Sequence, residues 1–128
     1  MNRKILFTAS LLGIIAIVLG AFGAHSLKEV LTTEQLNTFE TGVKYQMYHA
    51  LFLLFLGNSN SITEKMKKYV LNLILFGVIL FSGSIYLLAT MAVTGINFKV
   101  IGILTPIGGL LLLLGWGIFG MQVLQKKS

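Results

Sequence analysis

The sequence contains no cysteine and little charge. Only 11% of its 128 residues are Asp, Glu, Lys or Arg, whereas a soluble domain has about 25%. The lack of cysteine excludes disulfides, thiolate metal sites and cysteine nucleophiles. The low charge cannot cover a water-soluble surface, since 55% of the residues are hydrophobic. We therefore expect one membrane domain covering residues 1–128, with the lipid bilayer as its surroundings.

The net charge of +6 follows a pattern that is typical of membrane topology. A nucleic-acid interface needs a basic patch interleaved with polar or aromatic contacts on an exposed face. Here the charges fall in short clusters between long apolar runs. We expect no nucleic-acid partner.

Four segments are candidates for crossing the bilayer. From Ile5 to Ala24 there are twenty residues without a charge, and at 1.5 Å per residue they reach roughly 30 Å. This run is longer than the core of a signal peptide, which has about 7–15 residues, so we expect a retained helix. Uncharged runs also cover 69–93 and 100–124. The remaining candidate, the second in chain order, covers 36–57 and is long enough only if its first half carries polar residues.

Capping motifs predict where two helices begin. Thr32 followed by Gln35 is a capping box, which starts a helix near Thr33. Ser61 and Glu64 have the same spacing, so we expect Ser61 to cap the third helix. The connections are short, and short connections make successive helices antiparallel neighbours. The predicted fold is all-α: an integral membrane four-helix bundle with up-down-up-down topology.

The basic residues predict that both termini are cytoplasmic. Four spans place both termini on one side of the membrane, with seven basic residues against three on the other side. The seven are Arg3, Lys4, Lys65, Lys67, Lys68, Lys126 and Lys127, and the three are Lys28, Lys44 and Lys99. Because basic residues are enriched in cytoplasmic loops, we expect a multi-pass protein of the cytoplasmic (inner) membrane.

Small residues form a stripe along the first span. They are Ala9, Gly13, Ala16, Gly20 and Ala24, at spacings of three or four. Small residues let helix backbones approach closely in lipid, so the stripe predicts a packing face. The alternative is the lining of a channel.

Polar side chains gather in the half of the spans away from the termini, which this topology makes the outer half. They are His25, Tyr45, Gln46, His49, Ser84 and Tyr86. An ionisable residue inside a membrane is a functional-site hypothesis by default, so His49 is the main candidate. Two interpretations stay open. The imidazole is neutral and bonded across helices, to Ser84 or Tyr86, or the cluster is a shallow outward-facing pocket.

The fourth span contains residues that break helices. Pro106 cannot donate a hydrogen bond to the carbonyl of Gly102, and Gly108 and Gly109 loosen the following turn. We therefore predict a kink at this point, which is more often a feature of packing than part of a binding site.

Four motifs occur in order along the chain. They are GAFGAH at 20–25, YQMYHA at 45–50, FSGSIY at 81–86, and TPIGG at 105–109 followed by Gly115-Trp116. Together they resemble the small bacterial membrane proteins grouped as domain of unknown function 423. The resemblance covers essentially the whole chain. It implies a four-helix integral membrane protein of about this length, and it transfers no catalytic residue.

The sequence favours a structural or accessory role in the cytoplasmic membrane, with a membrane-protein partner or a homo-oligomer. One alternative is a small oligomeric channel or transporter. Since no Asp or Glu lies deep in a span, His49 would then be the titrating group. The other alternative is a binding module for a lipid, quinone or haem in the polar pocket around His49.

Metal and enzyme chemistry find little support in the sequence. His25 and His49, without nearby carboxylates or thiols, are too few ligands for a metal site. There is no Ser/His/Asp set, no pair of catalytic carboxylates and no phosphate-cradling loop. We expect no metal, no cofactor and no enzymatic activity.

Overall fold

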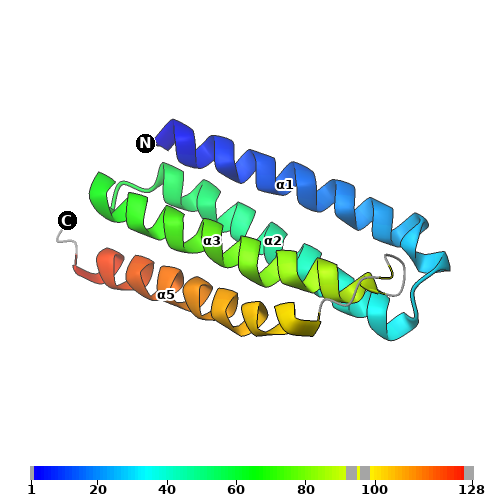
Figure 1. Cartoon of the computed structure of the whole chain (residues 1–128). Helices are drawn as coiled ribbons and strands as arrows, with labels where there is room; N and C mark the ends of the chain where they lie inside the picture. Colours follow the sequence, from blue (N-terminus) through cyan, green and yellow to red (C-terminus); the bar gives the residue numbers. More distant parts are fainter. Residues whose placement is uncertain (1, 92–94, 96–98, 126–128) are drawn as a thin grey trace.

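The structure is a computed structural model that describes residues 2–91, 95 and 99–125. The described residues form four long antiparallel helices (Figure 1): α1 Asn2–His25, α2 Thr33–Asn58, α3 Glu64–Ala89 and α5 Leu104–Gln125. Short 3-10 helices, η1 Leu27–Glu29 and η2 Lys99–Ile103, precede α2 and α5. The predicted all-α four-helix bundle is confirmed. The end of the bundle where α1 begins and α5 ends is called the terminal end, and the opposite end is called the distal end.

Each helix packs mainly against the next one along the chain. α1 contacts α2, α2 contacts α3, and α3 contacts α5. Asn2–Glu29, α3 and Ile101–Gln125 are long and apolar enough to cross a membrane. α2 is less apolar than these three, but it is as long as they are and packs between α1 and α3.

The start of α2 is as predicted, and the start of α3 is not. The backbone N–H of Gln35 donates to Thr32 Oγ1 at 3.1 Å, and the N–H of Thr32 donates to Gln35 Oε1 at 2.9 Å, which completes the capping box. α3 is capped by Thr63, whose hydroxyl accepts from Met66 N–H, so the prediction that Ser61 caps it is wrong. The N–H of Ser61 instead donates to Ser59 Oγ, because a short turn precedes α3.

The last two predicted spans differ from the observed helices at their distal ends. α3 ends at Ala89, whereas the prediction extended to residue 93, and residues 92–94 lie outside those described. The predicted span 100–124 begins as the 3-10 helix η2 and becomes α-helical at Leu104. Pro106 therefore lies in the first turn of α5, where its missing N–H removes no α-helical hydrogen bond.

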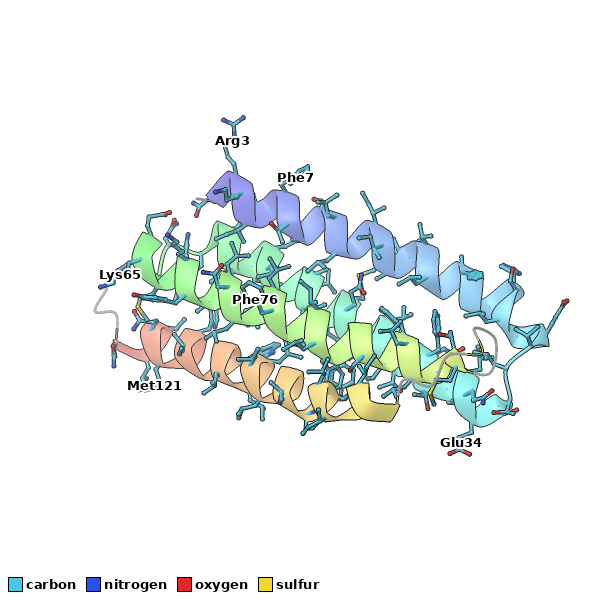
Figure 2. The ribbon with its side chains drawn as sticks, in the orientation of Figure 1. Arg3, Phe7, Glu34, Lys65, Phe76 and Met121 are labelled. Atoms are coloured by element: carbon cyan, nitrogen blue, oxygen red, sulfur yellow. The ribbon has the colours of Figure 1, made fainter. Side chains whose placement is uncertain are left out.

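The main apolar core fills the terminal half of the bundle. Leu53, Leu56, Val70 and Ile74 are completely buried there between α1, α2, α3 and α5. A smaller cluster around Phe39 lies at the distal end. On the outside, Phe7, Phe76 and Met121 are exposed apolar side chains, as expected for a lipid-facing surface (Figure 2).

The small residues of α1 lie against α2. Ala9 and Ala16 are buried, and a Cβ on Gly13 would lie 4.0 Å from the Cβ of Ala50. The predicted packing face is confirmed, except that Gly23 takes part where Ala24 was expected. A Cβ on Gly23 would lie 3.1 Å from the Phe39 ring, whereas Ala24 is exposed.

Candidate functional site

Gln46 connects three helices through its amide group. Its Nε2 donates to the backbone carbonyl of Leu12 in α1 at 2.8 Å, and its Oε1 accepts from the Tyr86 hydroxyl of α3 at 2.7 Å. The side chain is buried on α2. Gly42, one turn earlier on α2, makes room for this contact, because a Cβ there would lie 2.7 Å from the Tyr86 ring. Both polar atoms of this buried side chain thus bond to neighbouring helices.

Two serines of α3 also bond to neighbouring helices. Ser82 Oγ donates to the Gly42 carbonyl of α2 at 2.7 Å. Ser84 Oγ lies 2.5 Å from Thr105 Oγ1 of α5 and also donates to the carbonyl of Phe81. Both serines are buried, so these bonds satisfy hydroxyl groups that lipid could not satisfy.

The His49 side chain of α2 is buried against α5, and its hydrogen-bond partners determine which ring nitrogen carries the proton. Trp116 Nε1 donates to His49 Nε2 at 3.0 Å, and His49 Nδ1 lies 2.6 Å from the carbonyl of Tyr45. An indole N–H is only a donor, so Nε2 must accept and carries no proton. Nδ1 then carries the proton and donates a hydrogen bond to the backbone carbonyl of Tyr45. His49 is therefore a neutral imidazole bonded across helices.

The cross-helix partner of His49 is not the one that the sequence suggested. Tyr86 bonds to Gln46 and Ser84 bonds to Thr105, so neither reaches the imidazole. Trp116 takes this place from α5, and its ring meets the imidazole edge-on with centroids 6.0 Å apart. The sequence did contain a signal, because a tryptophan inside a membrane protein needs an acceptor for its N–H.

Gln46, His49 and Trp116 lie near the middle height of the bundle, whereas the Ser84–Thr105 pair lies near its distal end. Gln46 is the fourteenth of the 26 residues of α2, and Trp116 is the thirteenth of the 22 residues of α5. The prediction of the outer half is therefore wrong for Gln46 and His49. The register of α1 against α2, in which Gly13 faces Ala50, sets this depth.

His25 does not belong to this cluster. It is the exposed last residue of α1, twelve residues beyond Gly13, and Gly13 is level with Ala50. That separation is about 18 Å along the helix axis. His25 and His49 are too far apart to hold one haem or metal ion together.

Two grooves lie between α2 and α5, one on each side of Trp116. The first has a volume of about 500 Å³ and is called the Tyr45 groove. Its walls include Tyr45, His49, Phe81, Pro106, Gly109 and Trp116. The second, of about 360 Å³, is called the Tyr48 groove and is lined by Tyr48, Leu51, Phe52, Phe55, Trp116 and Phe119. Both are walled by exposed apolar side chains and open toward the lipid.

The residues predicted to kink the fourth span have separate places. Pro106 and Gly109 border the Tyr45 groove. Gly108 is the point where α5 touches the backbone of α3, since a Cβ there would meet the backbone nitrogen of Phe81 and lie 2.8 Å from the carbonyl oxygen of Gly77. The change from 3-10 helix to α-helix comes before these residues, between Ile103 and Leu104.

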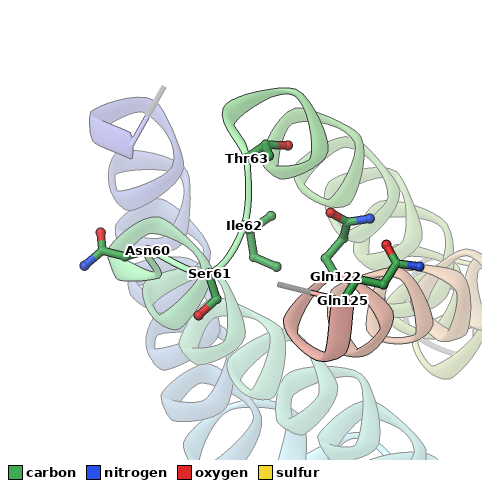
Figure 3. Close-up of a pocket in the computed structure, with 6 residues that line it drawn as sticks. All are labelled: Asn60, Ser61, Ile62, Thr63, Gln122 and Gln125. Atoms are coloured by element: carbon green, nitrogen blue, oxygen red, sulfur yellow. The ribbon is translucent and has the colours of Figure 1, made fainter. Parts of the chain in front are cut away.

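A smaller polar pocket at the terminal end was not predicted from the sequence. It has a volume of about 280 Å³ and lies between the α2–α3 connection and the last turns of α5 (Figure 3). Asn60, Ser61, Ile62, Thr63, Gln122 and Gln125 line it. Its polar groups are neutral, and they come from two segments far apart in sequence.

Comparison with known proteins agrees with this architecture. A family model described as "Protein of unknown function (DUF423)" matches residues 19–109, which include Gln46, His49 and most of the motifs described above. The chain belongs to this family. The DUF423 resemblance is therefore confirmed, and with it the prediction of a multi-pass membrane protein.

Curated relatives extend the match over nearly the whole chain. The UPF0382 membrane protein of Haemophilus influenzae is 39% identical over 128 residues, covering 100% of this chain and 99% of the relative. The UPF0382 membrane protein SSP2132 of Staphylococcus saprophyticus is 39% identical over 114 residues, covering 89% of this chain and 91% of the relative. The UPF0382 inner membrane protein YgdD of Escherichia coli K12 is 32% identical over 127 residues, covering 98% of this chain and 93% of the relative. No solved structure matches.

Proposed function

We propose that this DUF423 protein is a structural or accessory component of the cytoplasmic membrane and not an enzyme. The observation that carries the proposal is the use of Gln46, whose two amide atoms both bond to other helices. A residue employed in this way holds the bundle in one arrangement. The name of the Escherichia coli relative, an inner membrane protein, supports the location.

The same bonds count against the channel alternative. That alternative needs His49 to titrate, but both ring nitrogens of His49 are engaged in hydrogen bonds. Toward the terminal end, the fully buried side chains of Leu53, Leu56 and Ile74 separate the polar cluster from water. An ion or proton taking this route would lose its hydration in an apolar core, which is strongly unfavourable.

Reconstitution tests the proposal. We expect purified protein in liposomes to leave proton and potassium gradients unchanged relative to empty liposomes. We also expect the chain, solubilised gently from its own membrane, to migrate in a stoichiometric complex with another membrane protein. Flux that is present in the wild type and absent in His49→Ala would replace the accessory role with transport.

The proposal includes an orientation with both termini in the cytoplasm. Its support is the clustering of Arg3, Lys65, Lys67 and Lys68 at the terminal end (Figure 2 labels Arg3 and Lys65). Because the chain has no cysteine, single cysteines give a clean test. We expect a membrane-impermeant maleimide to label Ser26→Cys in intact cells, and Ser61→Cys only after permeabilisation. The reverse pattern would invert the topology.

A further inference from the structure

The Tyr45 hydroxyl lies in an unusual place. Tyr45 is the thirteenth of the 26 residues of α2, about 18 Å from the distal end of that helix. Its side chain is 40% exposed on the wall of the Tyr45 groove. Within the part of the chain that the structure describes, no group pairs with its hydroxyl, in contrast to Tyr86. A hydroxyl without a hydrogen-bond partner is unfavourable among apolar groups.

The groove beside this hydroxyl is large enough for a ring. Its volume of about 500 Å³ lies in the range of small-molecule sites. One wall is formed by the rings of Tyr45 and Phe81, which are tilted against each other with centroids 4.9 Å apart, and another is the indole of Trp116. Gly109 keeps a third side open, because only the Phe81 ring lies within 4 Å of where its Cβ would be.

The chemistry of the lining selects the ligand. Among the residues that the structure describes, no charged side chain lines the groove, and His49 is neutral through its own hydrogen bonds, so a charged group has no partner there. Both nitrogens of His49 and the indole N–H are occupied, which leaves the Tyr45 hydroxyl as the available donor. The matching ligand is a flat, uncharged ring that carries a carbonyl acceptor.

Depth decides between the possible lipids. A phospholipid keeps its phosphate and ester groups near the interface, because moving them into hydrocarbon is unfavourable. A quinone ring has no charge and carries its carbonyls to the middle of the bilayer, with an isoprenoid tail that fits among apolar side chains such as Leu110 and Leu113. We infer that the Tyr45 groove binds a quinone-class lipid, with the Tyr45 hydroxyl donating to a ring carbonyl and the ring lying against Trp116.

Trp116 makes the binding measurable, because it is the only tryptophan in the chain. We expect a benzoquinone with a decyl tail to quench its fluorescence saturably in detergent-purified full-length protein. A tryptophan octyl ester in the same micelles, quenched only by partitioning, is the baseline. Loss of one hydrogen bond in Tyr45→Phe should weaken binding about three- to tenfold. Gly109→Leu, which fills the groove, should abolish saturable quenching.

Tyr48→Phe is the matched control. Tyr48 lies three residues after Tyr45 on the same helix, is also exposed, and lines the Tyr48 groove instead. We expect its affinity for the quinone to equal that of the wild type. Melting temperatures of all three variants establish whether each is folded. If one of Tyr45→Phe and Gly109→Leu does not fold, the other still tests the inference.

Several outcomes would overturn the inference. If quinone quenches the wild-type fluorescence no more steeply with concentration than that of the tryptophan octyl ester, the groove does not bind quinone. Equal weakening by Tyr45→Phe and Tyr48→Phe would leave the hydroxyl without a specific role. Displacement by phosphatidylglycerol as effective as displacement by a second quinone would make the groove an ordinary acyl-chain contact. Conversion of a dimer into a monomer by Tyr45→Phe would make the occupant a second copy of the chain.

Discussion

Helix α5 meets its two neighbours in opposite ways. Against α3 it is held by three glycines at close approach: Cβ atoms at Gly77 and Gly115 would lie 2.7 Å from the side chains of Leu112 and Ile74, and one at Gly108 would meet the backbone of Phe81. Against α2 it is held by rings. Phe52 and Trp116 have centroids 4.3 Å apart, and Phe52 and Phe119 have centroids 5.2 Å apart.

The difference shows how one helix can provide both stability and a site. Close backbone approach leaves no room for a ligand, and it gains dispersion energy over many atoms. Large rings keep α2 and α5 apart and cannot fill the space around themselves, which leaves a groove on each side of Trp116. Binding is therefore expected on the aromatic side, and stability depends chiefly on the glycine side.

The strongest test of this comparison is Gly108→Ala. The added Cβ meets the α3 backbone, which cannot rotate away as a side chain can, so α5 must shift. We expect a loss of about 3 kcal/mol in the free energy of unfolding, at the upper end of overpacking effects. The control is Gly117→Ala, where nothing lies within 4 Å and helix propensity favours alanine. Denaturant titration in mixed micelles measures both, and equal stability of the two variants would contradict the close contact.

A second change acts on the aromatic side. Trp116→Leu removes the ring and leaves His49 Nε2 without its donor, and we expect the free energy of unfolding to fall by about 2 kcal/mol. Trp116→Phe keeps a ring beside Phe52 and removes only the N–H, so we expect the free energy of unfolding to fall by about 1 kcal/mol. The same denaturant titration, followed by circular dichroism, ranks them. Identical losses would mean that the ring itself contributes nothing.

The smallest effect is expected at the single pair of hydroxyls, Ser84 and Thr105, that joins α3 to α5. Thr105→Val removes one partner of Ser84 while keeping the shape of the side chain, and we expect a loss of about 0.6 kcal/mol, typical of polar bonds between membrane helices. Ser10→Ala, on the exposed face of α1, is the control and should change stability little. A loss above that of Trp116→Leu would make this bond, and not the rings, the principal polar link to α5.

Much of the fold could be predicted because membrane spans obey few rules. Length and charge located three spans, and the capping box at Thr32 located the start of the remaining helix, α2. The start of α3 was misplaced because Ser61 and Thr63 are both capping residues, and only the folded turn decides between them.

The site was harder to predict because it depends on register between helices. The sequence correctly selected Gln46 and His49 as buried polar residues inside the bundle. It could not tell that Trp116 reaches His49, because that contact depends on how α5 sits on α3 and how α3 sits on α2. The misjudged depth has the same origin, since no local pattern reports that Gly13 faces Ala50.

The order in which the helices pack has a consequence for biosynthesis. Chains emerge from the ribosome with the N-terminus first, and here each helix packs against the one made just before it. A newly inserted helix therefore finds its partner already in the membrane. The contacts between α2 and α5 are the exception: the Nε2 atom of His49, for example, gains its donor only from Trp116, which is synthesised 67 residues later. Until then its imidazole has no cross-helix donor, so insertion of α5 is the step that closes the membrane-embedded fold.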